Sequence, residues 1–313
     1  MRSRMLLPTV VIALLSLSAS LGLAQDATPE ATAEMLEPGP DVILVDKPGL
    51  MPEGIEYDSE RDALLIGSVT QGTIHAVALD GTLTPLASSD NLTSSAGIEV
   101  DEANNRLLAA ANVGNREGAA LGIYDLETGE ELAFVDLTAA APDAGGYFAN
   151  DVAVDDAGNA YVTDSAAGVI YQVDREGNAS VFLEDASFRG QFVINGIVYH
   201  PNGYLLASRA NGYVKIPVDD PASFTAVEMP DAVGADGMIL LDDTTLITVY
   251  RGRVLRIESA DNFATAAITG EFSAPGTTVA ARGDEVYLVN ANFNNPQAES
   301  YPLTKVVFTE PEM

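Results

Sequence analysis

A short phrase recurs six times along this chain of 313 residues. Each copy opens on a polar or small residue and continues with an apolar run. A turn rich in acidic residues, Gly or Asn then leads to a second apolar run. The copies open 41 to 54 residues apart, at Glu53, Ala96, Asn150, Asn195, Asp236 and Thr277. Repeats of this length made of short strands are typical of a β-propeller with one blade per repeat. The sequence therefore predicts an all-β fold, a six-bladed β-propeller.

The third copy indicates how each repeat divides into strands. Residues 152–154 and 160–163 predict two strands joined by a tight turn, and residues 169–173 and 179–183 predict two more. Gly, Asn and Asp, which tolerate the backbone angles of turns, separate these segments. Helical periodicity is absent through the repeats. We therefore expect four-stranded blades.

The sixth copy lacks an obvious fourth strand before the chain ends. A short apolar segment, residues 41–45, stands just before the first copy. Pairing of this segment with the last blade would remove two exposed sheet edges. The sequence therefore predicts a ring that is closed by an N-terminal strand.

The N-terminus has the pattern of an export signal. Arg2 and Arg4 precede an apolar run over residues 6–17, and small residues lead to Ala24. This run is too short for a membrane-spanning helix and is typical of a secretory signal peptide over residues 1–24, cleaved near Ala24. Residues 25–40, rich in Ala, Pro, Thr and Glu, predict a disordered spacer before a propeller over 41–313. We expect a secreted or periplasmic protein.

The charge of the chain limits its partners. It contains 46 acidic and 15 basic residues, for a net charge of −31, and no cysteine. Nucleic acid is excluded as a partner because phosphate binding requires clusters of Lys and Arg. An acidic surface attracts cations instead. We expect a monomer without a membrane span that binds a small molecule.

Four of the opening residues carry oxygen ligands. Because the innermost strand of every propeller blade starts at the same face, the side chains of Glu53, Asn150, Asn195 and Asp236 are expected near the central axis. Two carboxylates and two amide carbonyls suit Ca²⁺, although other divalent cations are possible. Zinc is disfavoured because cysteine is absent and the two histidines, His75 and His200, stand alone. Alternatively, each of the four residues caps a strand or turns the backbone.

The loops between second and third strands return to the same face. They include residues 68–70, 112–114, 164–165 and 290–294, together with Arg209, Tyr250 and Arg251. Arg209 and Arg251 are candidates for binding an anionic group there. The alternative is that both pair with surface carboxylates.

The opening phrases resemble those of a known family. Pro52-Glu53-Gly54, Asn150-Asp151, Asn195-Gly196 and Asp236-Gly237-Met238 are similar to the senescence marker protein/gluconolactonase/luciferin-regenerating-enzyme family, which includes regucalcin. These are calcium-dependent, phosphotriesterase-like six-bladed propellers, and the resemblance extends over residues 41–313. It implies that Glu53, Asn150, Asn195 and Asp236 bind the metal. It also implies that Asp236 is the general base.

One position departs from the family pattern. Sugar lactonases of the family carry a substrate-binding Arg two residues before the Asn that matches Asn150, where this chain has Phe148. An aromatic ring removes a bidentate donor and adds apolar surface. Phe192, Tyr250 and Met238 are expected to add more. The implied substrate is more apolar than an aldonolactone, unless Phe148 simply packs in the core.

Two functions fit these observations. The first is a calcium-dependent hydrolase of the lactonase or esterase type, with the metal as Lewis acid and Asp236 as base. The second is a non-catalytic exported propeller that binds a small molecule or a protein on its rim, with calcium purely structural. The fold alone is compatible with both.

Overall fold

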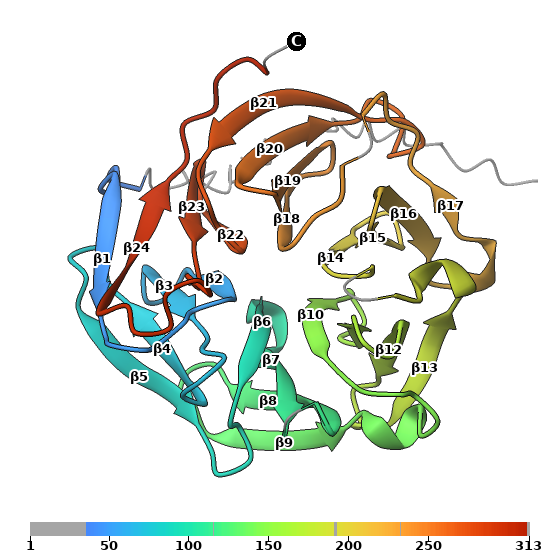
Figure 1. Ribbon diagram of the computed structural model, residues 1–313, viewed down its shortest axis with the longest axis horizontal. Coiled ribbons are helices and arrows are strands. Elements are labelled where there is room, and N and C mark those ends of the chain that lie inside the picture. The colour runs from blue at the N-terminus through green and yellow to red at the C-terminus, as the bar shows by residue number, and fades with distance from the viewer. Residues whose placement is uncertain (1–35, 115, 191–192, 232, 312–313) are drawn as a thin grey trace, which may run out of the picture. The chain divides into compact units, whose positions relative to one another are not determined.

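Repeats one to five each form one four-stranded antiparallel sheet, and the sixth forms one together with a strand from the N-terminal end of the propeller. The six sheets surround a common axis (Figure 1). The structure, a computed structural model, describes residues 36–114, 116–190, 193–231 and 233–311. The chain divides into two units, Met1–Glu37 and Pro38–Met313, and the second of these is the propeller. The predicted six-bladed, all-β fold is confirmed.

The blades follow one another along the chain, and in blades one to five each strand pairs with the next in sequence. Blade one contains β2 (Ile55–Asp58), β3 (Ala63–Ile66), β4 (Thr73–Val77) and β5 (Leu83–Ser88). Blade two contains β6 (Ser95–Asp101), β7 (Arg106–Val113), β8 (Gly118–Asp125) and β9 (Glu131–Asp136). Blade three contains β10 (Ala149–Val154), β11 (Ala160–Asp164), β12 (Val169–Val173) and β13 (Ala179–Glu184).

The remaining blades follow the same plan. Blade four contains β14 (Ile197–His200), β15 (Tyr204–Arg209), β16 (Gly212–Pro217) and β17 (Thr225–Ala226). Blade five contains β18 (Met238–Asp242), β19 (Thr245–Tyr250), β20 (Arg253–Glu258) and β21 (Ala267–Ser273). Blade six contains β22 (Thr278–Arg282), β23 (Glu285–Val289), β24 (Ser300–Lys305) and β1 (Val42–Asp46). Short 3₁₀ helices lie in the connections, at Glu102–Asn104, Thr138–Ala140, Ala186–Phe188 and Pro221–Ser223.

The N-terminal strand closes the ring. Strand β1 pairs antiparallel with β24, from Val42 opposite Thr304 to Asp46 opposite Ser300, and forms the outer edge of blade six. Its alternate residues Ile43 and Val45 are buried, whereas Val42 and Leu44 are about half exposed. This alternation is what one covered face and one solvated face produce. The predicted closure is confirmed, with the strand one residue later than predicted.

The ordered propeller begins slightly before the predicted boundary at residue 41. The Gly39 backbone N–H donates to the Glu285 carboxylate, and the Lys305 ammonium donates to the Gly39 carbonyl over 2.7 Å. Residues from Pro38 onward thus belong to the compact unit. The predicted signal peptide and the spacer up to residue 35 lie outside the described residues. Among the described residues, no helix has the length and apolar character needed to cross a membrane.

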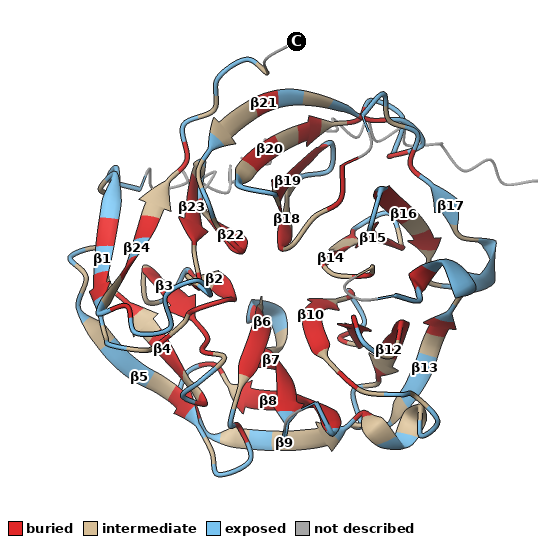
Figure 2. Cartoon of the chain, in the orientation of Figure 1, coloured by how far each residue is buried: buried red, intermediate tan, exposed pale blue. Residues whose placement is uncertain are grey.

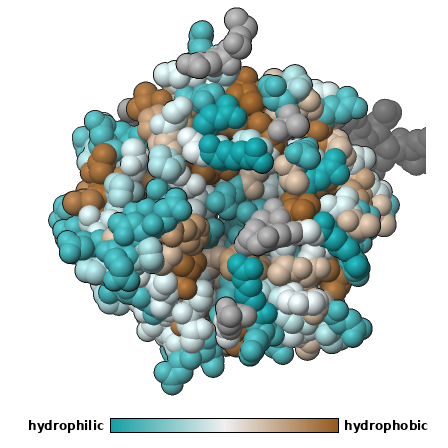
Figure 3. All heavy atoms as spheres, in the orientation of Figure 1, coloured by the Kyte–Doolittle hydropathy of each residue, from teal (hydrophilic) through white to brown (hydrophobic). Residues whose placement is uncertain are grey.

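The core lies between neighbouring blades. Inner strands are buried along most of their length, and burial falls towards the outer strands (Figure 2). Hydrophilic residues predominate on the molecular face drawn in Figure 3, as the net charge of −31 leads one to expect.

Both histidines belong to this packing. His75, on β4, is buried, and its burial lowers the pKa of the imidazole. The buried His200 ring stacks on Tyr204 and forms a 2.8 Å hydrogen bond with the Asp243 carbonyl, which links blades four and five.

Glycines allow the innermost strands to approach one another around the axis. A Cβ on Gly54 would lie 2.4 Å from the Ala96 carbonyl oxygen, and one on Gly196 would lie 2.5 Å from that of Asp236. A Cβ on Gly97 would lie 2.4 Å from Oδ1 of Asp151. Since real Cβ atoms do not approach so closely, each of these positions requires Gly. The Gly that follows Glu53, Asn195 and Asp236 therefore sets the tight radius of the inner ring.

Candidate metal centre

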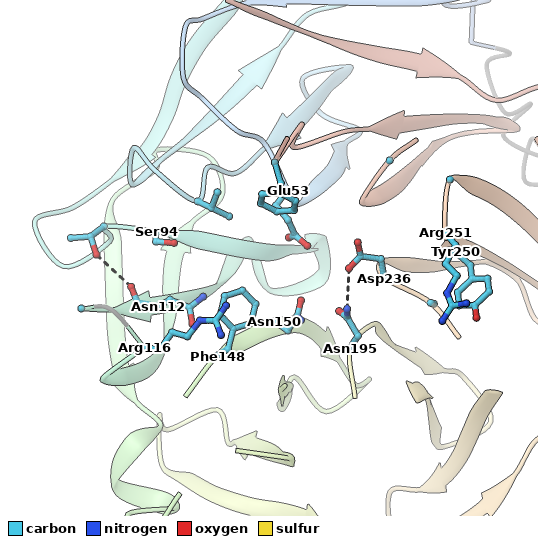
Figure 4. A pocket seen from close by; sticks show the side chains of 17 residues that line it. Glu53, Ser94, Asn112, Arg116, Phe148, Asn150, Asn195, Asp236, Tyr250 and Arg251 are labelled. Carbon is cyan, nitrogen blue, oxygen red and sulfur yellow. Dashed lines mark hydrogen bonds between the residues drawn. The ribbon is translucent and has the colours of Figure 1, made fainter. Parts of the chain in front are cut away.

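The four predicted metal ligands line one cavity of about 920 Å³ at the mouth of the ring (Figure 4). Glu53, Asn195 and Asp236 lie in the loops that enter β2, β14 and β18, and Asn150 is the second residue of β10. In Figure 4 the carboxylates of Glu53 and Asp236 point towards the same space, and the two amides face them. The ring thus brings together residues that lie far apart in the sequence.

Glu53 is the most buried carboxylate of the set, with 7% of its surface exposed. Its Oε2 is buried and has no hydrogen-bond partner among the described residues. Burial, with the nearby charges of Asp236 and Asp151, raises the pKa of Glu53 well above its usual range. The backbone is fixed from the sixth blade, because the Thr277 hydroxyl donates to the Glu53 carbonyl over 2.9 Å.

Asp236 and Asn195 are directly linked. The Asn195 Nδ2 group donates to Asp236 Oδ1 over 2.9 Å. Burial raises the pKa of Asp236 to about 6, although the hydrogen bond from Asn195 acts in the opposite direction. The Asp236 backbone N–H donates to the Val249 carbonyl over 2.7 Å, which fixes the loop against β19.

Asn150 is held through blade three. Its Nδ2 donates to the Ser165 hydroxyl over 2.7 Å, and that hydroxyl in turn donates to the Ile194 carbonyl. The neighbouring Thr163 hydroxyl donates to the Asn195 carbonyl over 2.7 Å. Side chains from the end of β11 therefore hold the backbone that carries Asn195, the candidate ligand of blade four.

Asp151, next to Asn150, connects three inner strands. Its two oxygens accept the backbone N–H groups of Val152 and Ile197, each over 3.0 Å. Burial raises the pKa of Asp151 to about 7, and the Asp236 charge adds to this rise, although these hydrogen bonds oppose it. Asp151 occupies the space that Gly97 leaves open on β6. Its role here is to join blade three to blade four beside the cavity.

The donor set fits a hard divalent cation. All four side chains carry oxygen donors, and Glu53 has a buried oxygen for which the described residues provide no partner. Burial raises the pKa of both Glu53 and Asp236, an effect that a bound cation would oppose. Oxygen-only ligation is what Ca²⁺ prefers. Among the described residues no group of three or more His, Cys, Asp or Glu side chains could hold a metal ion, so a cation bound here would need the two amides as additional ligands.

The structure places the other predicted site residues as follows. Phe148, Tyr250 and Arg251 line the cavity. Arg209 is not among the lining residues; together with hydrogen bonds from Ser187, its charge lowers the pKa of Asp185. Phe192 lies outside the described residues. Met238 is buried in the core instead of adding to the cavity wall, because β18 directs it against the hydrophobic residues of blades four and five.

Several further residues of the cavity were not predicted as site residues, and Asn112, Arg116 and Phe293 are the three discussed next. Asn112, at the end of β7, donates to the Ala149 carbonyl over 3.0 Å, and its buried Oδ1 has no partner among the described residues. Arg116 and Phe293 lie in rim loops and also line the cavity. Asn112 could have been found from its place in the loop over residues 112–114. No sequence signal distinguishes Arg116 from a surface arginine.

Comparisons with known proteins identify the fold. No protein-family model matches the chain, and a search of curated proteins finds no relative. Among solved structures, the major allergen Mala s 1 of Malassezia sympodialis is 21% identical, with a TM-score of 0.71 over 85% of this chain and 96% of that one. A gluconolactonase of Xanthomonas campestris is 16% identical, with a TM-score of 0.59 over 84% and 89%. A calcium-binding protein, regucalcin of Agrobacterium tumefaciens, is 18% identical, with a TM-score of 0.59 over 87% and 97%. The chain therefore shares the six-bladed propeller fold of gluconolactonase and regucalcin, members of the family that its repeated phrases resemble.

Proposed function

We propose that this protein is a calcium-dependent hydrolase that acts on a small, rather apolar lactone or ester. The observation that carries the proposal is the Glu53 carboxylate, which is buried near the axis and lines the same cavity as Asp236. One of its oxygens has no hydrogen-bond partner in the part of the chain that the structure describes. The gluconolactonase and regucalcin folds support a lactonase-type reaction with calcium. Glu53, Asn150, Asn195 and Asp236 are the proposed ligands.

In the proposed reaction, different residues of the chain have different roles. When bound, the cation supplies Lewis acidity towards the carbonyl oxygen of the substrate. Asp236, ionised when the cation is bound, is placed to accept a proton from the attacking water. Asn195 orients the Asp236 carboxylate through its 2.9 Å hydrogen bond. Phe148 and Tyr250 provide apolar walls for the body of the substrate.

The proposal is tested by pH-stat hydrolysis of a panel of lactones and esters, with added Ca²⁺ and after treatment with a chelator. We expect turnover that requires Ca²⁺ and falls by about 10²-fold or more in Asp236→Asn, because loss of a general base has effects of this size. Asp231→Asn, on an exposed loop, is the matched control. Absence of turnover with every substrate, in folded and calcium-loaded protein, would contradict the proposal.

The second candidate is a non-catalytic propeller that binds a small molecule or a protein on its rim, with calcium as a structural ion. One comparison favours it: the allergen Mala s 1 is similar over 96% of its own length. In this case Asp236→Asn lowers the calcium-dependent stability, and no member of the substrate panel is turned over.

A further inference from the structure

The connections between the second and third strands of the blades differ in length around the mouth of the cavity. They cover residues 290–299 in blade six, 67–72 in blade one, 114–117 in blade two, 165–168 in blade three, 210–211 in blade four and 251–252 in blade five. Residues from those of blades one, two, five and six line the cavity. The two longest connections therefore belong to the neighbouring blades six and one.

The segment between β1 and β2 ties these two connections together. The Gly49 N–H donates to the Ala298 carbonyl over 3.0 Å, on the side of blade six. On the side of blade one, the Thr70 hydroxyl donates to the Gly49 carbonyl over 2.7 Å. The Gln71 side-chain amide donates to the Pro48 carbonyl over 3.0 Å. In Figure 1 the red connection between β23 and β24 accordingly runs towards blade one.

The blade-six connection is also held by hydrogen bonds of its own. The Asn292 N–H donates to Asn290 Oδ1 over 2.9 Å, and the Asn295 N–H donates to the Asn292 carbonyl over 2.8 Å. Asn292 has a φ of 54°, a left-handed conformation that Asn tolerates better than most residues. Ala291 is fully buried. This turn determines the position of Phe293, the next residue.

Phe293 is a large apolar side chain with 55% of its surface exposed, and it lines the cavity. Val69, from the blade-one connection, lines the cavity as well. The equally exposed Leu132 lies on the outer strand β9 and is not among the lining residues. An exposed ring at the border of a cavity buries its apolar surface only when a ligand or a partner covers it.

We infer that the ligand of this cavity carries an extended apolar chain that runs from the axial centre past Val69 to the Phe293 ring. This inference rests on the proposed function and narrows its substrate to esters or lactones with a long alkyl or acyl chain. Phe293 is then a residue that determines specificity, and it takes no part in the chemical step.

The polarity of the cavity gives the chain its direction. Carboxylates and amides surround the axis, where a polar carbonyl group is favoured over a hydrocarbon chain. Towards Phe148 and Tyr250, a guanidinium carbon lies 5.1 Å from the centre of each ring, so charge accompanies the apolar surface there. Val69 and Phe293 provide apolar surface on the side of blades one and six.

The first test measures binding, independent of turnover. Isothermal titration calorimetry of the calcium-loaded protein compares octanamide with butyramide, which has the same polar end and a shorter chain. We expect octanamide to bind about tenfold tighter, the effect of burying about two methylene groups. In Phe293→Ala the preference should fall to about threefold or less, because the chain loses its contact with the ring. Phe293→Leu, which keeps a large apolar side chain, should retain most of it.

A fluorescent reporter tests where the chain ends. The protein contains no Trp, so Phe293→Trp introduces a single indole at the rim. Octanamide should shift its emission to shorter wavelengths, since a chain that covers the indole removes it from water, and butyramide should have a much smaller effect. An emission spectrum that octanamide leaves unchanged overturns the inference.

Leu132→Ala is the matched control, because it removes an apolar side chain of the same exposure outside the cavity. It should keep the tenfold preference. The inference is wrong if the two amides bind equally, if neither binds, or if Phe293→Ala and Leu132→Ala have the same effect. It is also wrong if the wild type is a dimer that Phe293→Ala converts into monomers in sedimentation, because a second copy would then cover the ring.

A kinetic test separates this inference from the proposed function. The ratio of kcat/KM for 4-nitrophenyl octanoate to that for 4-nitrophenyl acetate should be high in the wild type and should fall in Phe293→Ala. Hydrolysis of both esters with a ratio that Phe293→Ala leaves unchanged supports the hydrolase and overturns the inference. If neither ester is hydrolysed while octanamide shows a preference that depends on Phe293, the proposed function fails and the site for the apolar chain stands.

Discussion

Glu53 combines three properties that a carboxylate rarely has together. It is almost fully buried, one of its oxygens has no partner among the described residues, and two other acids lie near it. Burial of an unpaired charge is unfavourable, so without a cation the group is driven towards its protonated form. The side chain is therefore a source of instability in the metal-free protein and of affinity for a cation.

Glu53→Gln separates these two effects. At pH 8, with both proteins metal-free, the variant should have a higher free energy of unfolding than the wild type, because a neutral amide removes the buried charge. The wild type should gain about 2.7 kcal/mol at a Ca²⁺ concentration 100 times its Kd, and the variant should gain almost nothing. Urea unfolding with Ca²⁺ and with chelator measures both, and Glu60→Gln on an exposed turn is the control. Equal calcium stabilisation of the two proteins would remove Glu53 from the ligand set.

The sequence was sufficient to predict that Glu53, Asn150, Asn195 and Asp236 meet in one cavity, and insufficient for the walls around them. Glu53, Asn150, Asn195 and Asp236 occur at the same point of a repeated phrase, so the symmetry of the ring determines where they meet. Arg116 lies in a loop that is not repeated in the other blades, and its place depends on contacts with Tyr147 and Phe148. Arg209, at the end of β15, does not line the cavity.

At the scale of the inner strands, Gly97 and Asp151 act as a pair. Gly97 on β6 leaves the room that the Asp151 carboxylate uses to reach the Ile197 N–H on β14. Blade three is also the blade in which the residue after the proposed ligand is not Gly. An acid bridging two strands replaces the close backbone approach seen after Glu53, Asn195 and Asp236.

Gly97→Ala should disturb the candidate centre without touching a ligand. The new methyl group would lie 2.4 Å from Asp151 Oδ1 and 2.8 Å from the Asn150 carbonyl oxygen, so β10 must move. We expect a loss of about 1–3 kcal/mol in stability, as for other overpacked sites, together with weaker Ca²⁺ binding by calorimetry. Gly145→Ala, where a Cβ meets nothing within 4 Å, should change neither. Unchanged calcium affinity in Gly97→Ala would show that the inner strands tolerate displacement of Asn150.

At the scale of the whole molecule, the axial acids make stability depend on pH in an unusual direction. Burial raises the pKa of Asp236 to about 6, of Asp151 to about 7 and of Glu56 to about 8. In the unfolded chain such groups titrate near pH 4. Between these limits the folded state binds more protons than the unfolded state, so the free energy of unfolding falls as pH rises.

The metal-free protein should consequently be more stable at pH 5 than at pH 8. The expected slope is about 1.4 kcal/mol per pH unit for each proton that the folded state holds in excess. The pKa of Asp62 is lowered by its hydrogen bonds to Arg282, so its effect falls below pH 4, outside this window. Urea unfolding at the two pH values measures the difference, and saturating Ca²⁺ should reduce it. Greater stability at pH 8 in chelator would contradict the assignment of the axial acids.

Ring closure gives a second prediction at this scale. Ile43 is buried in the core shared by β1, blade one and blade six, whereas the adjacent Leu44 is about half exposed. Ile43→Ala should lower the free energy of unfolding by about 2–5 kcal/mol, and Leu44→Ala should have little effect. Thermal or urea unfolding of the two variants gives the comparison. Equal losses in both would indicate that β1 does not pack as an alternating edge strand.

The fold itself was largely predictable because the same pattern of apolar runs and polar turns recurs in every repeat. The period, the number of blades and the pairing of the first strand with the last blade all followed from residues visible in the sequence. Strand ends were less certain: residues 152–154 were predicted as a strand, and β10 begins at Ala149. The strand residues that the sequence did not predict include Asn150 and Asp151. Their polar side chains do not fit the apolar pattern of a strand, and their hydrogen-bond partners come from elsewhere in the ring.

The pairing of β1 with β24 also determines when folding can finish. Val42 is among the first residues of the propeller to be synthesised and its partner Thr304 is among the last, whereas every blade from one to five is made of consecutive strands. Domains begin to fold while the chain is still being made, so those five blades can form in order during synthesis. Blade six can form completely only after β24 has been synthesised, because it combines β1 with the last three strands of the propeller. A ribosome-bound or truncated chain that lacks residues 300–305 therefore leaves β1 without its partner and the ring open.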